Sequence, residues 1–305
     1  MQPRPLNGLL VVDLTRYLPG PFASRELLRL GARVVRLEAR EGDPVREVAA
    51  DWDARLNAGK ESVVCDLKTD PALGHALCRR ADVVLEGFRP GVAARLGVGP
   101  DDVPAETVYC SIRGFGGGDV RAGHDLNYMA WVGALAATAP ASPPVPVADL
   151  GGALTIVAMV LAALLERERT GRGARLEVAL AEVAAELAPF GDPLTGELAC
   201  YRLYETADGR HLSLAALEPR FWTRLVELVD RPDLLPRAQD GHRELEELFA
   251  SRPLADWLEL FDGEDVAAAP VRTLAEAALP EPNGRPPSLG EHTEAWRREL
   301  ALAAT

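Results

Sequence analysis

The first 180 residues alternate between short, almost continuously apolar runs and segments with helical spacing. Valine-rich runs of this length are typical of parallel strands buried on both faces. The predicted strands cover residues 9–14, 34–38, 63–67, 83–88, 108–112 and 174–180. The predicted helices cover residues 23–30, 71–80 and 152–169. This alternation predicts an α/β fold whose parallel sheet is covered by helices.

The second half of the chain has a different pattern. It follows a Pro/Gly-rich stretch at residues 189–193, and its predicted strands and helices are shorter. Strands are predicted over 201–206 and 212–217, and helices over 221–229, 245–261 and 294–303. We therefore expect a large domain over residues 1–185, joined by 285–305, and a small α+β domain over 186–284.

Composition narrows the class of protein. A chain of 305 residues that is 48% hydrophobic can bury a large core. Its formal charge of −13 argues against a general binder of nucleic acids or anionic membranes. Four scattered cysteines fit reduced thiols better than disulfides or a zinc site. The apolar run over residues 154–165 is shorter than the roughly 20 residues of a membrane span. We expect a cytoplasmic protein without a membrane span.

Common nucleotide and hydrolase motifs do not fit. The glycines of residues 114–118 suggest a dinucleotide site, but Asp119 stands where its last glycine should be and no helix follows. The chain has neither a phosphate-binding loop with its lysine nor a serine nucleophile elbow. We therefore expect no nicotinamide, no metal and no other cofactor for the chemistry.

Two residues carry the candidate chemistry. His124 lies in a loop next to Gly123, and Asp149 precedes a glycine pair and a long apolar helix. A histidine and a carboxylate presented from two loops can take a proton from one face of a carbon and return it to the other. Without further context, Asp149 is equally explained as a helix N-cap and His124 as a surface residue.

A series of short motifs, kept in order along the chain, resembles a known family. The motifs include LNGL at 6–9, GDP at 42–44, NAGK at 57–60, EGFRPG at 86–91, GHD at 123–125 and ADGR at 207–210. They resemble the family III CoA-transferases and their α-methylacyl-CoA racemase branch. The resemblance implies a Rossmann-like large domain, a small domain and two interlocked chains. It also implies a CoA thioester as substrate, with coenzyme A entering only as part of that substrate.

The resemblance assigns roles to particular residues. In the racemase branch His124 and Asp149 are the two acid/base groups, and Glu218 pairs with the histidine. In the transferase branch the carboxylate of Asp149 carries a covalent acyl or CoA adduct. The histidine at position 124, and the lack of a glycine run before Ala207, favour the racemase. Supporting positions are Asp125, Tyr128, Gly151 and Gly152; the two glycines would offer backbone N–H groups to the enolate.

The same resemblance places the CoA-binding residues. They are Arg40, Lys68, Gly87, Phe88, Arg89, Arg95 and Leu96, with Arg40 standing in for an arginine expected at Ala39. Lys60 and Lys68 are the only lysines in the chain. Because lysine is a compact point charge suited to phosphate, we expect these ammonium groups to serve the nucleotide.

The chain also departs from the family pattern. It lacks much of the segment between residues 180 and 201 and part of the segment after 277. Three hypotheses stay open: a racemase or epimerase of 2-methylacyl-CoA, a CoA-transferase, and a CoA-binding protein or subunit without catalysis. The acyl group is not identified by the sequence.

Overall fold

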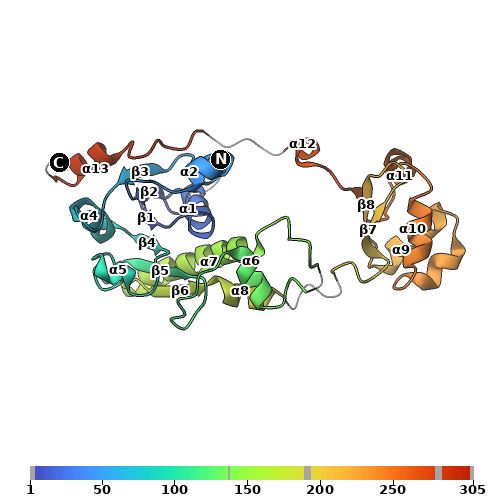
Figure 1. Ribbon diagram of the computed structural model, residues 1–305, viewed down its shortest axis with the longest axis horizontal. Helices are drawn as coiled ribbons and strands as arrows, with labels where there is room; N and C mark the ends of the chain where they lie inside the picture. The colour runs from blue at the N-terminus through green and yellow to red at the C-terminus, as the bar shows by residue number, and fades with distance from the viewer. Residues whose placement is uncertain (1–3, 137, 189–193, 279–283, 303–305) are drawn as a thin grey trace. The chain divides into compact units, whose positions relative to one another are not determined.

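The computed structural model describes residues 4–136, 138–188, 194–278 and 284–302 (Figure 1). The chain forms two compact units. The large unit comprises Met1–Glu186 with Glu281–Thr305, and the small unit comprises Leu187–Pro280. The Pro/Gly-rich stretch at 189–193 lies outside the described residues.

The large unit is built on six parallel strands, which confirms the predicted α/β fold and parallel sheet. The strands are β1 (Leu10–Leu14), β2 (Arg33–Glu38), β3 (Glu61–Val64), β4 (Val83–Glu86), β5 (Val108–Arg113) and β6 (Arg175–Ala179). Their order is β3-β2-β1-β4-β5-β6, so the direction of winding reverses between β1 and β4. A reversal of this kind leaves a crevice at the carboxyl ends of the strands, where open α/β sheets bind ligands.

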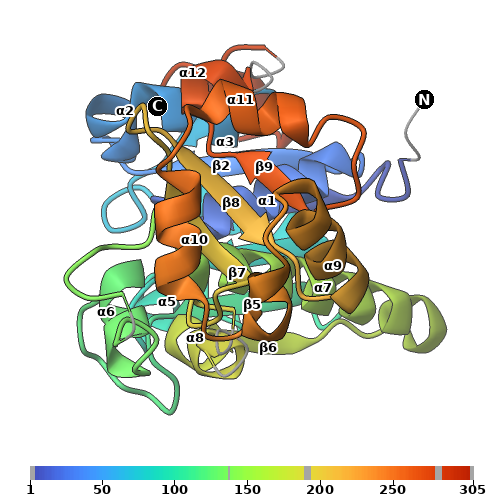
Figure 2. The same ribbon diagram turned by 90° about the vertical axis from the view of Figure 1, so that its right-hand side faces the viewer.

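Helices cover both faces of this sheet (Figures 1 and 2). One core cluster joins the sheet to α1 (Pro19–Arg29), α6 (Asp125–Trp131), α7 (Val147–Thr170) and α8 (Leu180–Leu187). The other joins it to α4 (Ala72–Arg80), α5 (Val92–Arg95) and α13 (Thr293–Glu299). Two short helices, α2 (Val45–Val48) and α3 (Ala50–Asn57), follow β2. Within β1, Val11 enters the first cluster and Val12 the second, as the alternation of a strand requires.

Helix α7 begins at Val147, five residues before its predicted start, and ends at Thr170. Among the described residues it alone is long and apolar enough to cross a membrane. However, Ala153, Ile156 and Val160 are completely buried in the core of the large unit. We therefore interpret α7 as a core helix, as its apolar run predicts.

The small unit is an antiparallel sheet with helices packed on one face. Its strands, in the order β7-β8-β9, are β7 (Tyr201–Glu205), β8 (His211–Ala215) and β9 (Ala268–Pro270). Its helices are α9 (Pro219–Leu228), a 3-10 helix (Pro232–Arg237), α10 (His242–Phe249), α11 (Leu254–Leu260) and α12 (Leu274–Ala277). The single helix predicted over 245–261 is wrong: Pro253 restricts the residue before it, so α10 ends at Phe249 and α11 begins after the proline.

Candidate active site

A cavity of about 180 Å³ lies at the carboxyl ends of β1, β4 and β5, where the strand order reverses. We call it the central cavity. His124 and Asp149 both line it, although they are 25 positions apart in sequence. The remaining walls come from the loops after β1 and β4, from the end of β5 and from α6; they include Thr15, Arg16, Tyr17, Gly87, Phe88, Arg113 and Tyr128. The fold therefore brings the two candidate acid/base groups to one space.

Asp149 occupies the first turn of α7 and is 8% exposed. Its backbone N–H donates to a carboxylate oxygen of Asp125 at 2.9 Å. Burial, and then the neighbouring charge of Asp125, raises the pKa of Asp149 to about 7. Within the described residues Asp149 has no ion-pair partner that would oppose this shift. A carboxyl group with this pKa exists in both protonation states near neutral pH, as general acid/base catalysis requires.

His124 is the N-cap residue of α6 and its side chain is exposed. Its backbone N–H donates to the side-chain oxygen of Asn127 at 3.1 Å. The imidazole meets the ring of Tyr17 edge-on, with centroids 5.5 Å apart. Tyr17 has a φ of 66°, which is rare for a residue with a side chain, and its N–H donates to Asp43 at 3.0 Å. The hydrogen bond to Asp43 fixes the backbone of Tyr17, so its ring stays beside His124.

Tyr128 fixes the loop that carries His124. Its buried hydroxyl donates to the carbonyl of Gly123, directly before the histidine. A Cβ at Gly123 would lie 2.8 Å from the Tyr128 ring, and a Cβ at Gly114 would lie 2.7 Å from its hydroxyl. Burial raises the pKa of Tyr128 to about 12, so its hydroxyl stays protonated and continues to donate. Both glycines therefore allow the tyrosine to pack against the loop.

The expectation that Gly151 and Gly152 offer backbone N–H groups to the enolate is wrong, because of where α7 begins. Because α7 begins at Val147, both glycines lie beyond its first free N–H groups and their amides belong to the helix ladder. A Cβ at Gly152 would lie 2.2 Å from the side chain of Leu180. This glycine serves close packing, and neither N–H is free to bind an enolate.

A second cavity, of about 280 Å³, opens beside the ends of β1, β2 and β3. We call it the β2–β3 cavity. Four of the residues predicted to bind CoA line it: Arg40, Lys68, Phe88 and Leu96. It shares Leu14, Thr15, Arg16 and Phe88 with the central cavity, so one extended ligand can occupy both.

A third cavity, of about 640 Å³, adjoins the central one on the side of His124. We call it the arginine cavity because Arg16, Arg89, Arg113 and Arg121 line it. Arg89 and Gly87 are predicted CoA-binding residues, whereas Arg16 is not among the predicted ones. The signal for Arg16 is its position: it lies two residues after the end of β1, at the crevice where the strand order reverses.

Three predicted positions lie elsewhere. Arg95, on α5, lines none of these three cavities. Lys60 is only 3% exposed, and its ammonium donates to Pro21, Ser24 and Asn57 at 2.7–2.8 Å. The expectation that Lys60 serves a phosphate is therefore wrong; burial lowers its pKa to about 8. Glu218, the exposed N-cap residue of α9, belongs to the small unit, and its pairing with His124 stays a prediction.

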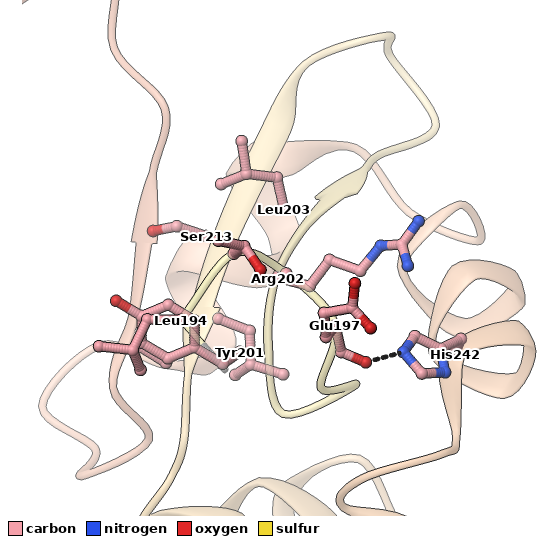
Figure 3. A pocket seen from close by; sticks show the side chains of 11 residues that line it. Leu194, Glu197, Tyr201, Arg202, Leu203, Ser213 and His242 are labelled. Carbon is pink, nitrogen blue, oxygen red and sulfur yellow. Dashed lines mark hydrogen bonds between the residues drawn. The ribbon is translucent and has the colours of Figure 1, made fainter. Parts of the chain in front are cut away.

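The small unit has its own cavity, of about 950 Å³ (Figure 3). Leu194, Tyr201, Leu203 and Ser213 line it, on the face of the sheet opposite the buried core (Figure 3). Its histidine, His242, contacts the carbonyl of Glu197 through Nε2 at 2.8 Å. That contact ties the 194–197 loop to α10, which gives His242 a structural role. The central cavity is the better candidate for chemistry.

A family model and individual related proteins place this chain in the same family. A family model described as CoA-transferase family III matches residues 6–285. Human alpha-methylacyl-CoA racemase is 35% identical over 308 residues, covering 89% of this chain and 78% of that protein. Succinyl-CoA:mesaconate CoA-transferase of Haloarcula hispanica is 32% identical over 324 residues, covering 89% and 81%.

Solved structures agree with this result. A hypothetical protein of Mycobacterium tuberculosis, Rv3272, has a TM-score of 0.81 and 29% identity, covering 96% of this chain and 99% of that one. A CaiB/BaiF family protein of Brucella suis has a TM-score of 0.82 and 26% identity, covering 98% and 100%. Racemases and transferases are thus similar to this chain at comparable identity.

Proposed function

The chain belongs to CoA-transferase family III, and within this family we propose that it is a racemase or epimerase of 2-methylacyl-CoA thioesters. The observation that carries the proposal is that Asp149 and His124 line one cavity at the reversal of strand order. Racemase relatives at 30–35% identity support it. Coenzyme A enters as part of the substrate, and no metal or further cofactor is required.

The proposed reaction is a proton transfer through an enolate. The α-hydrogen of a thioester is a weak acid, so its removal needs a base on one face of the carbon and an acid on the other. The raised pKa of Asp149 suits it to either role. His124 supplies the opposite group, and Tyr17 and Tyr128 hold its ring and its loop. Each positioned group contributes roughly 10²–10⁴-fold to the rate.

Substrate binding follows from the neighbouring cavities. Arg40 and Lys68 supply positive charge in the β2–β3 cavity for the nucleotide end of CoA. Phe88 lines both this cavity and the central one, so the pantetheine arm passes it on the way to Asp149. The residues shared by the two cavities support a single binding path from nucleotide to thioester.

A CoA-transferase is the second candidate, because transferase relatives reach 32% identity. In that reaction the ionised carboxylate of Asp149 attacks the thioester and releases the CoA thiolate. A pKa of about 7 leaves a large fraction of this carboxyl protonated at neutral pH. That fraction weakens a nucleophile but suits an acid/base group, so it favours the racemase.

The two reactions are separated by hydrogen exchange in D₂O. Each enantiomer of a 2-methylacyl-CoA is incubated with wild type, His124→Ala, Asp149→Asn and the exposed control Asp101→Asn. A two-base racemase exchanges and inverts both enantiomers. Each active-site variant should stop inversion yet retain exchange on one enantiomer, a different one for each variant, while Asp101→Asn behaves as wild type.

The opposite outcome is equally clear. Wild type that exchanges no α-hydrogen, but gains the mass of an acyl or CoA adduct on the peptide containing Asp149, is a transferase. Loss of that adduct in Asp149→Asn, with His124→Ala still forming it, would complete the case against the racemase.

A further inference from the structure

Arg16 occupies an unusual place among the charged residues of the large unit. It lines the central, β2–β3 and arginine cavities, so its side chain lies where all three meet. Within the described part of the chain its guanidinium has neither a hydrogen bond nor an ion pair. Other exposed arginines of this acidic protein pair with a carboxylate, as Arg33 does with Glu61 at 2.7 Å, but those line none of the three cavities except Arg121. Arg16 is therefore a cation available to a ligand.

The backbone around Arg16 is fixed on both sides. The N–H and hydroxyl of Thr15 both donate to the buried carboxylate of Asp13. The N–H of Tyr17 donates to Asp43, whose carboxylate is also ion-paired with Arg36 at 3.0 Å. A cation on a fixed backbone loses less conformational entropy when it binds an anion.

The arginine cavity extends this positive charge beyond the reacting groups. Among the charged side chains that line it, Arg113 is paired with Glu86 at 2.7 Å, and Arg121 with Asp119 at 2.7 Å. Arg16 and Arg89 have no such partner in the described residues, so the cavity retains a net positive charge. Arg121 is also held in place by stacking on Phe115 and Trp131. A simple alkyl chain gains nothing from these charges.

We propose that Arg16 and the arginine cavity bind a second carboxylate at the far end of the acyl group, so that the substrate class is a CoA thioester of a branched dicarboxylic acid. This rests on the proposed function, which places the reacting carbon between Asp149 and His124. The cavity adjoins that position because it shares His124 and Tyr128 with the central cavity. The planar guanidinium of arginine matches a carboxylate with two parallel hydrogen bonds.

A phosphate of CoA is the other anion that Arg16 can reach, since it also lines the β2–β3 cavity. The geometry favours the acyl carboxylate, because Arg16 alone among the unpaired arginines lines the central cavity with Asp149. Arg89 lines only the arginine cavity, and Arg40 only the β2–β3 cavity.

The test measures binding, so that it does not depend on turnover. Isothermal titration calorimetry measures the affinity of four ligands. The first is 2-methyladipoyl-CoA, joined to CoA through the carboxyl beside the branch, and the second is the methyl ester of its terminal carboxyl. The third is 2-methylhexanoyl-CoA and the fourth is free CoA. All acyl ligands are racemic at the branched carbon. The proteins are wild type, Arg16→Met, Arg16→Lys and Arg298→Met, which removes an exposed arginine of α13 outside the cavities.

We expect wild type and Arg298→Met to bind the free carboxylate at least about tenfold more tightly than its methyl ester. Arg16→Met should bind the two equally, and Arg16→Lys should keep part of the preference. Equal binding of acid and ester by wild type would overturn the proposal. So would a uniform loss for all four ligands in Arg16→Met, because Arg16 would then hold a CoA phosphate.

These outcomes stay separate from those of the proposed function. A protein that prefers the terminal carboxylate but exchanges no α-hydrogen retains this substrate class and loses the racemase assignment. A protein that inverts 2-methylhexanoyl-CoA and shows no preference keeps the racemase assignment and loses this one.

Discussion

Two regions at the carboxyl end of the sheet are rich in charged side chains, and they differ in whether those side chains form ion pairs. The first is a buried ion network of Arg36, Glu38, Asp43, Arg46 and Asp53. The second is the central cavity with Asp149 and Arg16. In the network each charge has a partner, whereas within the described residues neither Asp149 nor Arg16 has one.

The network is organised around one guanidinium. Arg36 is 1% exposed and lies 2.8 Å from Asp53 and 3.0 Å from Asp43. Glu38 accepts from Arg46 and from the hydroxyl of Ser62. Burial alone would raise the pKa of Glu38, but these hydrogen bonds and the charge of Arg36 outweigh it and lower the pKa.

The comparison distinguishes the ion network, which stabilises the fold, from the central cavity, where we place the reaction. A buried charge costs several kcal/mol unless it is paired, so a fold retains an unpaired carboxyl such as Asp149 mainly where a ligand or a reaction uses it. Tyr17 connects the regions, because its N–H donates to Asp43 while its ring contacts His124. The paired region therefore holds the unpaired one in place.

The largest effect should come from breaking the network. Arg36→Met leaves Asp43 and Asp53 buried without their cation, and we expect a loss of about 3–5 kcal/mol of unfolding free energy. The difference between variant and wild type should begin to narrow below about pH 4.5, the ordinary pKa of Glu38, because the unfolded chain takes up this proton before the folded one does. Urea denaturation at pH 7 and pH 4 measures both. Arg33→Met, on the same strand but exposed, should cost about 1 kcal/mol or less.

The opposite sign is expected at the unpaired carboxyl. The native pKa of Asp149, about 7, exceeds its usual value of 3.8, so the folded state binds more protons between those values. Its stability therefore falls as pH rises from about 4 to 7. Asp149→Asn removes this cost and should be more stable than wild type at pH 8, by up to about 4 kcal/mol, with little difference near pH 4. Equal stability at both pH values would show that the carboxyl is not buried in this way.

The comparison also shows how far the sequence predicts the site. His124 and Asp149 are identifiable because the motifs around them are local and carry the family resemblance. Most of the six parallel strands are identifiable because buried strands are nearly continuously apolar, whereas β6, exposed along its first half, is identifiable by its alternation. Lys60 is assigned wrongly because its ammonium binds groups distant in sequence, such as the carbonyl of Pro21. Arg16 is overlooked because the meeting of three cavities around it depends on loops that are also distant in sequence.

The ends of helices and strands are also predicted poorly from the local sequence, because they depend on contacts distant in sequence. The glycine pair at 151–152 looks like a helix start, but Gly152 instead accommodates Leu180, whose position depends on β6. Strand β9 has only three residues and is held by pairing with β8 rather than by its own pattern. Glu218 shows the same limit, because its predicted partner lies in the other unit.

A smaller effect is expected from removing the ring of Tyr17, which connects the ion network to the central cavity. Tyr17→Ala keeps the Tyr17–Asp43 backbone contact but removes the ring that meets His124 at 5.5 Å. An aromatic contact contributes about 0.5–1.5 kcal/mol, so kcat should fall roughly threefold to tenfold with little change in KM. Tyr17→Phe retains the ring and should match wild type. A rise in KM for Tyr17→Ala, with unchanged kcat, would make Tyr17 a binding residue instead.

The smallest effect tests why the pKa of Asp149 is raised. Burial is the larger cause and the charge of Asp125 the smaller, so Asp125→Asn should lower the pKa by less than about one unit. Its amide oxygen still accepts from the Asp149 N–H, which preserves the geometry. The limb of the kcat/KM profile near pH 7 should therefore move to lower pH, because the carboxyl loses its proton more readily beside a neutral neighbour. An unmoved limb would show that the charge of Asp125 does not contribute to the raised pKa of Asp149.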